Sequence, residues 1–273
     1  MIKIKIPKKT NYEDFFRKKG LDWLLLTLKD GKKLPTFKQL TFKQLHGGNI
    51  NLKKNTPHLP NLKDLYNLYQ FIILNNRTTV LEYGCGWSTL IMHLALMENK
   101  KRFKNKAFKR CEKPYELISI DCSKKFIKIC KERIKKYSNN FNMVNFNFSN
   151  ARMTTFNNRY CTEYTNHPQV IPDLIYIDGP SPFSIKNKIE NFTTNSHGQM
   201  PMLCDILKFE HFLTPGTLII MDGRTANARF LKSNFQRKWK HLHNAYNDHH
   251  YFWLNEGSLG THNTEQLKFY LKK

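Results

Sequence analysis

The stretch Leu81-Glu82-Tyr83-Gly84-Cys85-Gly86-Trp87-Ser88-Thr89 decides the fold of this chain. The apolar residues within 78–83 predict a short strand, and two glycines follow it directly. Gly84 and Gly86 allow positive φ and a close approach between the backbone and a ligand. Ser88 or Thr89 can cap a following helix, whose first N–H groups can bind a ligand. The stretch therefore predicts a strand–turn–helix junction that cradles a ligand.

Outward from this junction, helical and extended patterns alternate from residue 62 to the C-terminus. Helices are predicted over 62–74, 88–97, 123–137 and 226–239, with another before Thr214, and strands over 78–83, 117–121, 144–148, 173–178 and 217–221. Two late strands, around 251–255 and 266–271, are expected to form a hairpin. This alternation predicts an α/β fold with a doubly wound, mainly parallel sheet and a C-terminal antiparallel hairpin. Ligands of such sheets bind beyond the carboxyl ends of the strands.

The first sixty residues follow a different pattern. Residues 1–6 alternate between basic and apolar and predict a short strand or an extended arm, and the apolar spacing within 12–28 predicts one or two short amphipathic helices. The pentapeptide at 36–40 is repeated at 41–45, which we interpret as a local duplication in a surface segment. Glycines and prolines up to Pro60 place a boundary there. We expect residues 1–60 to form a small helical extension or cap, and 61–273 to form the main domain.

Composition limits the possible classes of protein. The formal net charge is +24, which favours an anionic partner such as nucleic acid, although the abundance of Asn, Ile and Phe is typical of an A/T-rich coding sequence that also enriches lysine. Apolar runs are too short to span a membrane, and the N-terminus lacks the apolar segment of a secretory signal. We therefore expect a cytoplasmic protein. The six cysteines show neither zinc-site spacing nor a disulfide framework.

The junction at 81–89 resembles the first motif, h-h-[D/E]-x-G-x-G, of the class I S-adenosylmethionine (SAM)-dependent methyltransferases. A dinucleotide fold would usually have a third glycine where Thr89 stands. The resemblance runs from about residue 62 to the C-terminus and implies SAM as cofactor. It implies that an acid placed like Glu82 binds the cofactor's amino group directly or through water, and that Asp121 binds both ribose hydroxyls. Cofactor contacts are expected from Glu82, Tyr83, Gly84, Cys85, Gly86, Ser88, Asp121, Cys122, Asn150, Ala151 and Asp178.

Other interpretations of these acids remain open. Glu82 could be a buried acid that backbone donors satisfy, and Asp121 could cap a helix. Glu82 and Asp121 lie 39 positions apart, longer than the usual interval, and we interpret the basic stretch at 100–113 as an inserted surface loop. The residues Asn150 and Ala151, after the third strand, match the position at which the family commonly binds adenine.

Residues after the fourth and fifth strands are expected to face the methyl acceptor. The resemblance extends to O-methyltransferases that carry an acid after each of these strands, here Asp178 and Asp222. In metal-dependent members these acids bind Mg²⁺ with a neighbouring Asn, but Gly223 stands at that position, so Mg²⁺ and a catalytic role without metal both remain open. Arg224 can bind an anionic acceptor group or be solvated. His197 is a further candidate base, in a segment that could close as a lid, whereas His241, His243, His249 and His250 are expected at the surface.

The sequence therefore favours a SAM-dependent methyltransferase that acts on an oxygen of a small-molecule or glycan-type acceptor. The element of base-methylating enzymes, [D/N]-P-P-[Y/F], is matched poorly by Asp178-Gly179-Pro180-Ser181. A nucleic-acid methyltransferase is the first alternative because of the charge. A non-catalytic nucleic-acid or assembly module on the same fold is the second, and an NAD-dependent dehydrogenase is a further one.

Overall fold

The structure, a computed structural model, describes residues 2–22, 24, 61–106, 113–195 and 199–271. The chain divides into a main unit of residues 1–7 and 67–273 and a smaller unit of residues 8–66. The boundary expected near residue 60 stays a prediction.

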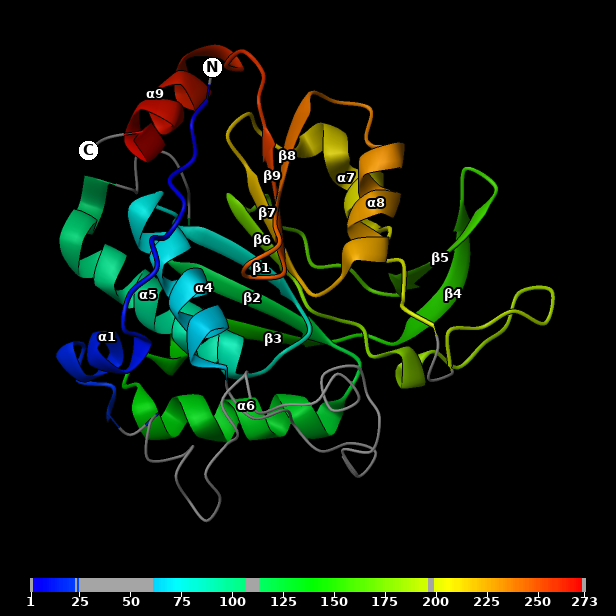
Figure 1. Ribbon diagram of the computed structural model, residues 1–273, viewed down its shortest axis with the longest axis horizontal. Helices are drawn as coiled ribbons and strands as arrows, with labels where there is room; N and C mark the ends of the chain where they lie inside the picture. The colour runs from blue at the N-terminus through cyan, green and yellow to red at the C-terminus, as the bar shows by residue number, and fades with distance from the viewer. Residues whose placement is uncertain (1, 23, 25–60, 107–112, 196–198, 272–273) are drawn as a thin grey trace. The chain divides into compact units, whose positions relative to one another are not determined.

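The main unit is built on a seven-stranded sheet (Figure 1). Its strand order is β3-β2-β1-β6-β7-β9-β8, and β9 alone runs antiparallel to its neighbours β7 and β8. The strands are β1 (Thr79–Tyr83), β2 (Glu116–Asp121), β3 (Val144–Phe148), β6 (Leu174–Ile177), β7 (Leu218–Asp222), β8 (Trp239–Asn244) and β9 (His249–Leu254). The predicted fold, a doubly wound and mainly parallel sheet with a C-terminal antiparallel hairpin, is confirmed. The order reverses between β1 and β6, so the ligand crevice of such a sheet is expected beyond the carboxyl ends of these two strands.

Helices cover both faces of the sheet. The longer ones are α4 (Leu62–Leu74), α5 (Trp87–Phe103), α6 (Lys124–Tyr137), α8 (Thr225–Asn234) and α9 (Gly260–Leu271), and α7 (Asp205–Phe209) is a short turn of helix. Because side chains alternate along a strand, Leu81 and Ile118 pack on the α7 and α8 side. Glu82 and Ser119 lie on the opposite side, where they meet the start of α5.

The late hairpin differs from the prediction in one strand. β9 lies where a strand was expected, but its partner is β8, and the residues expected as a strand at 266–271 belong to α9. This segment is a helix because residues at helical spacing pack on the Pro215–Gly216 turn. Asn263 donates to the Pro215 carbonyl, and the Tyr270 ring lies against Gly216.

Two helices also end at other positions than expected. α5 continues to Phe103, so the first part of the basic stretch 100–113 is helical and only residues 107–112 lie outside the description. α8 ends at Asn234, because the buried Glu210 carboxylate accepts the backbone N–H groups of Gln236 and Arg237 and the indole N–H of Trp239. These long-range bonds draw the chain out of the helix and into β8.

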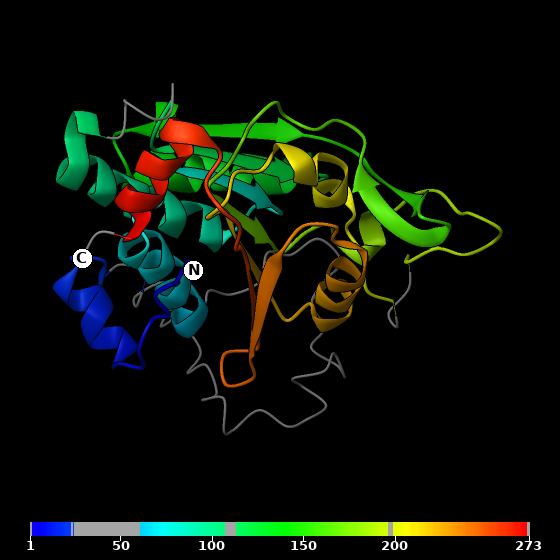
Figure 2. The same ribbon diagram turned by 90° about the horizontal axis from the view of Figure 1, so that it is seen from above.

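A second, two-stranded sheet was not predicted. β4 (Ala151–Phe156) and β5 (Arg159–Tyr164) form an antiparallel hairpin that projects beside the main sheet (Figure 2). Its turn is Asn157–Asn158, both at positive φ, a turn type that asparagine favours. The Asn-Asn pair between two alternating segments was the signal in the sequence.

The N-terminal arm is extended, as predicted, and is tied to the main unit. The Ile2 backbone N–H donates to the Asn255 side chain at 2.8 Å, and the Trp253 indole donates to the Ile2 carbonyl at 3.1 Å. The helix α1 (Tyr12–Lys18) lies in the smaller unit and is capped by the Asn11 side chain. The repeat at 36–45 lies outside the described residues.

No helix in the described part of the chain combines the length and apolarity needed to cross a membrane.

Candidate functional site

The glycine turn after β1 packs directly against the turn after β6. Gly84 has φ +95°, and a Cβ there would lie 2.7 Å from the Gly179 nitrogen. A Cβ on Gly179 would in turn lie 2.8 Å from the Gly84 Cα. Glycine is therefore required at position 84 for contact between the two turns, not for contact with a ligand. Gly86 is different: its φ of −168° suits any residue, and a Cβ there would meet only the Ser88 hydroxyl, at 3.7 Å.

The three amides of this turn already have acceptors inside the protein. Gly84 N–H donates to the Ile120 carbonyl at 2.8 Å, Cys85 N–H to the Asp121 carboxylate at 2.8 Å and Gly86 N–H to the Thr89 hydroxyl at 2.9 Å. A phosphate-binding loop aims its amides at the ligand. This turn is instead closed on itself and tied to the end of β2.

Glu82 is fully buried behind the turn. Its carboxyl accepts hydroxyl hydrogen bonds from Ser88 at 2.5 Å, Thr89 at 2.7 Å and Ser119 at 2.7 Å. Burial raises the pKa of Glu82 to about 8, against the lowering effect of the three hydroxyls and with a smaller rise from Asp178. Glu82 is thus a buried acid, but its donors are hydroxyls and not the backbone groups that the buried-acid interpretation expected. These hydrogen bonds connect the start of α5 to β1 and β2. A role of Glu82 in cofactor binding stays a prediction.

Asp121 ends β2 beside the glycine turn. One carboxylate oxygen accepts the Cys85 N–H and the other accepts the Ser123 N–H at 2.6 Å. Burial raises the pKa of Asp121, against these backbone donors. The helix-cap interpretation is wrong, because the cap of α6 is the Ser123 hydroxyl. The carboxylate thus lies at the predicted place, with the second lone pair of each oxygen still able to accept from a ligand.

Other predicted cofactor residues differ in accessibility. The Tyr83 side chain is fully buried, stacks on Tyr164 with ring centroids 5.7 Å apart, and bonds through its hydroxyl to His167. Ala151 is buried in the core, and Ser88 is buried against Glu82. Cys85 and Cys122 are half-buried, and Asn150 is exposed.

Tyr164 lies at this turn and was missed by the sequence reasoning. Its hydroxyl is buried, has no hydrogen-bond partner among the residues described, and lies 2.6 Å from where a Gly179 Cβ would be. A buried donor without an acceptor is uncommon in a native protein. It is the kind of group that a bound ligand or an ordered water satisfies.

The next part of the site is the turn that begins at Asp178, which Arg224 contacts. The Arg224 guanidinium is buried and donates through Nη2 to the carbonyls of Asp178 and Pro180, so it is not the solvated residue of the alternative interpretation. Desolvation raises the pKa of Asp178 to about 7, Arg224 lowers it, and the Asp222 and Asp121 carboxylates raise it further. The Asp178 side chain is itself exposed, so water moderates this effect until a ligand covers it.

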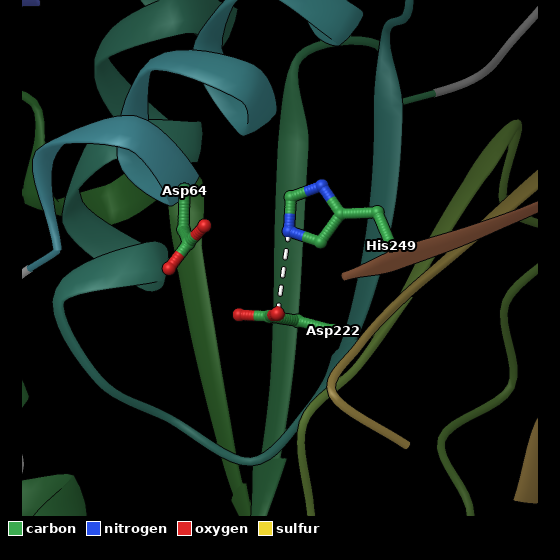
Figure 3. Close-up of side chains that lie close together, drawn as sticks. All are labelled: Asp64, Asp222 and His249. Atoms are coloured by element: carbon green, nitrogen blue, oxygen red, sulfur yellow. Dashed lines mark ion pairs between the residues drawn. The ribbon is translucent and has the colours of Figure 1, made fainter. Parts of the chain in front are cut away.

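Asp222 ends β7 and pairs with a histidine that the sequence reasoning placed at the surface. His249 begins β9 directly opposite Asp222, and its Nε2 lies 3.3 Å from the carboxylate (Figure 3). The His249 side chain is 1% exposed and that of Asp222 is 27% exposed. His249 also contacts the Tyr251 hydroxyl at 3.2 Å. Its partner is set by strand register, which the sequence spacing did not reveal.

The surface prediction is also wrong for His250, which is buried and bonds to the Thr225 hydroxyl at 2.9 Å and to His241 at 3.0 Å. His243 stacks on the His250 ring and is exposed, as expected. The remaining candidate base, His197, lies outside the described residues.

A cavity of about 780 Å³ lies at the amino ends of the parallel strands, opposite the site described above. It is lined by the first residues of β1 and β2, Thr79 and Glu116, and by Thr214 before β7. The site described above lies at the carboxyl ends of the same strands, where the strand order reverses. We place the candidate site at the carboxyl ends of the strands, because Asp121, Asp178 and Asp222 and the two glycine turns lie there.

The fold is that of a doubly wound α/β protein, and the candidate site lies at the switch point of the sheet. No protein-family model and no curated protein matches the sequence. Among solved structures, the chain is similar to the O-methyltransferase TomG of Streptomyces achromogenes in complex with SAM, with 11% identity and a TM-score of 0.42 over 72% of this chain and 82% of that one.

Two further structures are similar. For a putative caffeoyl-CoA O-methyltransferase from Staphylococcus aureus, identity is 13% and the TM-score 0.43, over 88% of this chain and 100% of that one. For a putative methyltransferase from Thermoplasma acidophilum, identity is 10% and the TM-score 0.37, over 66% of this chain and 70% of that one.

Proposed function

We propose that this chain is a SAM-dependent methyltransferase that acts on an oxygen of a small-molecule or glycan-type acceptor. The observation that carries the proposal is the placement of two carboxylates around the glycine turn of β1. Asp121 is bonded to that turn from the end of β2, and Asp178 follows β6, whose turn packs on Gly84. The two acids thus flank the point at which the strand order reverses, where a nucleoside cofactor binds in doubly wound sheets.

The closed glycine turn favours SAM over a dinucleotide. A pyrophosphate needs free amides, and the amides of Gly84, Cys85 and Gly86 are taken by protein acceptors. SAM carries no phosphate, and its ribose hydroxyls match the acceptor capacity that Asp121 retains. The unpartnered Tyr164 hydroxyl beside Gly179 adds a donor for the same ligand. When bound, SAM would supply an electrophilic methyl group on a sulfonium sulfur.

The residues of the chain would prepare the acceptor. Asp178 would take the proton of the acceptor hydroxyl; bound SAM would supply the methyl group and leave as S-adenosylhomocysteine. Arg224 holds the turn that carries Asp178 through two carbonyls, and His249 Nε2 lies 3.3 Å from one oxygen of Asp222. We assign Asp178 to proton transfer because its carboxylate is exposed at the end of β6 and its pKa is raised to about 7; Mg²⁺ binding and a cytoplasmic location stay predictions.

Calorimetry tests the cofactor assignment. We expect the full chain to bind SAM and Asp121→Ala to abolish binding, because the ribose loses its carboxylate and the turn loses its anchor. The matched control is Glu132→Ala, which removes an exposed acid from α6 and should leave affinity unchanged. A wild-type chain that binds NAD in preference to SAM, or neither, would overturn the proposal. Incubation with SAM and pools of glycans, metabolites and RNA, read by mass spectrometry, would then identify the methylated acceptor.

A further inference from the structure

The outer side of α6 presents a straight line of lysines. Lys124, Lys128, Lys131 and Lys135 follow one another at intervals of four, three and four residues, so they lie on one stripe of the helix. All four are exposed, and none has a carboxylate partner within the described part of the chain. At 1.5 Å per residue the stripe is about 16 Å long, which is roughly the span of five stacked nucleotides.

Aromatic rings lie beside this stripe. Lys124 Nζ is 4.9 Å from the Phe148 ring centroid, Lys131 Nζ is 5.8 Å from that of Phe146, and Lys135 Nζ is 5.3 Å from that of Phe141. Phe146 and Phe148 belong to β3, which pairs with β2 alone and forms one edge of the sheet. Phe148 is 39% exposed, a large fraction for a phenylalanine. The Phe141 and Phe146 rings are half-buried, so Phe148 offers the exposed stacking surface of the three. Cations beside an exposed ring are the pattern with which proteins bind single-stranded nucleic acid.

The basic surface continues at the end of α5. Lys100, Lys101 and Arg102 are exposed there, and Lys100 Nζ contacts the Met143 sulfur at 3.6 Å, just before β3. Glu132 is the single acidic residue of α6. The exposed cations at the end of α5 therefore add positive charge beside the start of β3.

We propose that this face, the α6–β3 surface made of the four lysines with Phe141, Phe146 and Phe148, binds a single-stranded nucleic acid. The lysines would neutralise phosphates, and a base would stack on the exposed Phe148 ring. An anionic membrane fits less well, because a membrane-surface helix must bury an apolar face in lipid. The apolar face of α6, formed by Ile127, Cys130 and Ile134, is already buried against the sheet.

Fluorescence anisotropy with a labelled oligouridylate tests the proposal without any methyl transfer, so its failure leaves the proposed function standing. If four phosphates are neutralised, the slope of log K against log salt is about −2.8, and affinity falls roughly 50-fold between 50 and 200 mM salt. Lys128→Gln with Lys131→Gln should reduce the slope by about 1.4. Phe148→Ala should weaken binding about 5-fold or more, because a stacking surface is lost, and leave the slope unchanged.

The matched control is Lys186→Gln with Lys188→Gln, which removes the same charge from exposed positions between β6 and α7. If this pair lowers affinity and slope as much as the α6 pair, binding follows net charge and the proposal is wrong. It is also wrong if polyglutamate competes as well as the oligonucleotide, or if phosphatidylserine vesicles bind more tightly than the oligonucleotide. Unchanged affinity in Phe148→Ala would equally contradict it.

Discussion

At the scale of single residues, the two glycines of the β1 turn have different tasks. Gly84 is held at positive φ against Gly179, whereas Gly86 lies in extended backbone with space around it. The motif alone treats them as equivalent. In the structure, Gly84 joins the two turns, and Gly86 leaves room next to the start of α5.

We expect Gly84→Ala to lower the free energy of unfolding by about 2–4 kcal/mol, because the new methyl group collides with the backbone of Gly179 at a strained φ. Gly86→Ala should cost less than about 1 kcal/mol, since it meets no backbone atom. Urea denaturation of both variants measures the difference. Equal losses in the two variants would show that the contact with Gly179 does not constrain the turn.

The raised pKa of Asp178 gives the proposed reaction a pH dependence. A proton acceptor must be ionised, and with its pKa at about 7 the carboxylate forms only as the pH rises through that value. We therefore expect kcat/KM to rise with pH around 7, and Asp178→Asn to remove this limb with a loss of about 10²–10⁴ in rate.

The control for this profile is Asp205→Asn. Burial also raises the pKa of Asp205 to about 7, but its carboxylate accepts the backbone N–H of Tyr164 and is buried, so it has no contact with an acceptor. That variant should keep the rising limb even if it is less stable. A limb that persists in Asp178→Asn would remove Asp178 from the proton transfer.

At the scale of elements, α9 is fastened to the amino edge of the sheet by a buried ionic group. The Asp173 carboxylate accepts from the Thr78 and Thr79 backbone and from the Tyr270 hydroxyl at 3.1 Å. Arg77 lies 4.1 Å from the Tyr270 ring centroid and donates to the Gly216 carbonyl at 2.8 Å. This group, and not the local sequence pattern, explains why the last segment is a helix on the edge of the sheet.

We expect Asp173→Asn to destabilise the chain by about 2–3 kcal/mol, because an amide replaces a carboxylate oxygen that accepts buried N–H groups and the charge that stabilises Arg77 is lost. Tyr270→Phe keeps the ring over Arg77 and removes one hydrogen bond, so it should cost about 1 kcal/mol. Thermal and urea unfolding compare the two variants. If Tyr270→Phe lowers the free energy of unfolding more than Asp173→Asn does, the Tyr270 hydroxyl, and not the Asp173 carboxylate, is the main contact that holds α9.

Elements whose pattern is local were predictable from the sequence. β1, β2, β6 and β7 are buried apolar runs with Gly or Asp near their ends, and β3 alternates apolar residues with Asn. Each of the five lies within two residues of its predicted bounds. β8 was not found, because Trp-Lys-His-Leu-His-Asn has no clear apolar alternation and its start depends on the distant Glu210. The short alternation at 266–271 fits a strand and a helix equally well, and only packing decides between them.

At the scale of the whole molecule, the candidate site was predictable as far as it follows strand ends. Asp121, Asp178 and Asp222 each come at the end of a parallel strand, and such ends meet at one edge. His249 could not be found in this way, because its position opposite Asp222 depends on the antiparallel register of β9. Tyr164 was missed for a similar reason: it comes from a hairpin outside the main sheet, and only the folded chain brings it to Gly179.

The burial of Glu82 also links the folding of this chain to proton uptake. An unfolded glutamate ionises near pKa 4.5, whereas the pKa of Glu82 in the folded chain is about 8. Between these values the folded chain holds a proton that the unfolded chain releases, so Glu82's contribution to stability is full below about pH 4.5 and is lost as the pH rises through 8. Raising the pH above 8 should therefore lower the free energy of unfolding through a group buried at β1, the strand that carries the glycine turn.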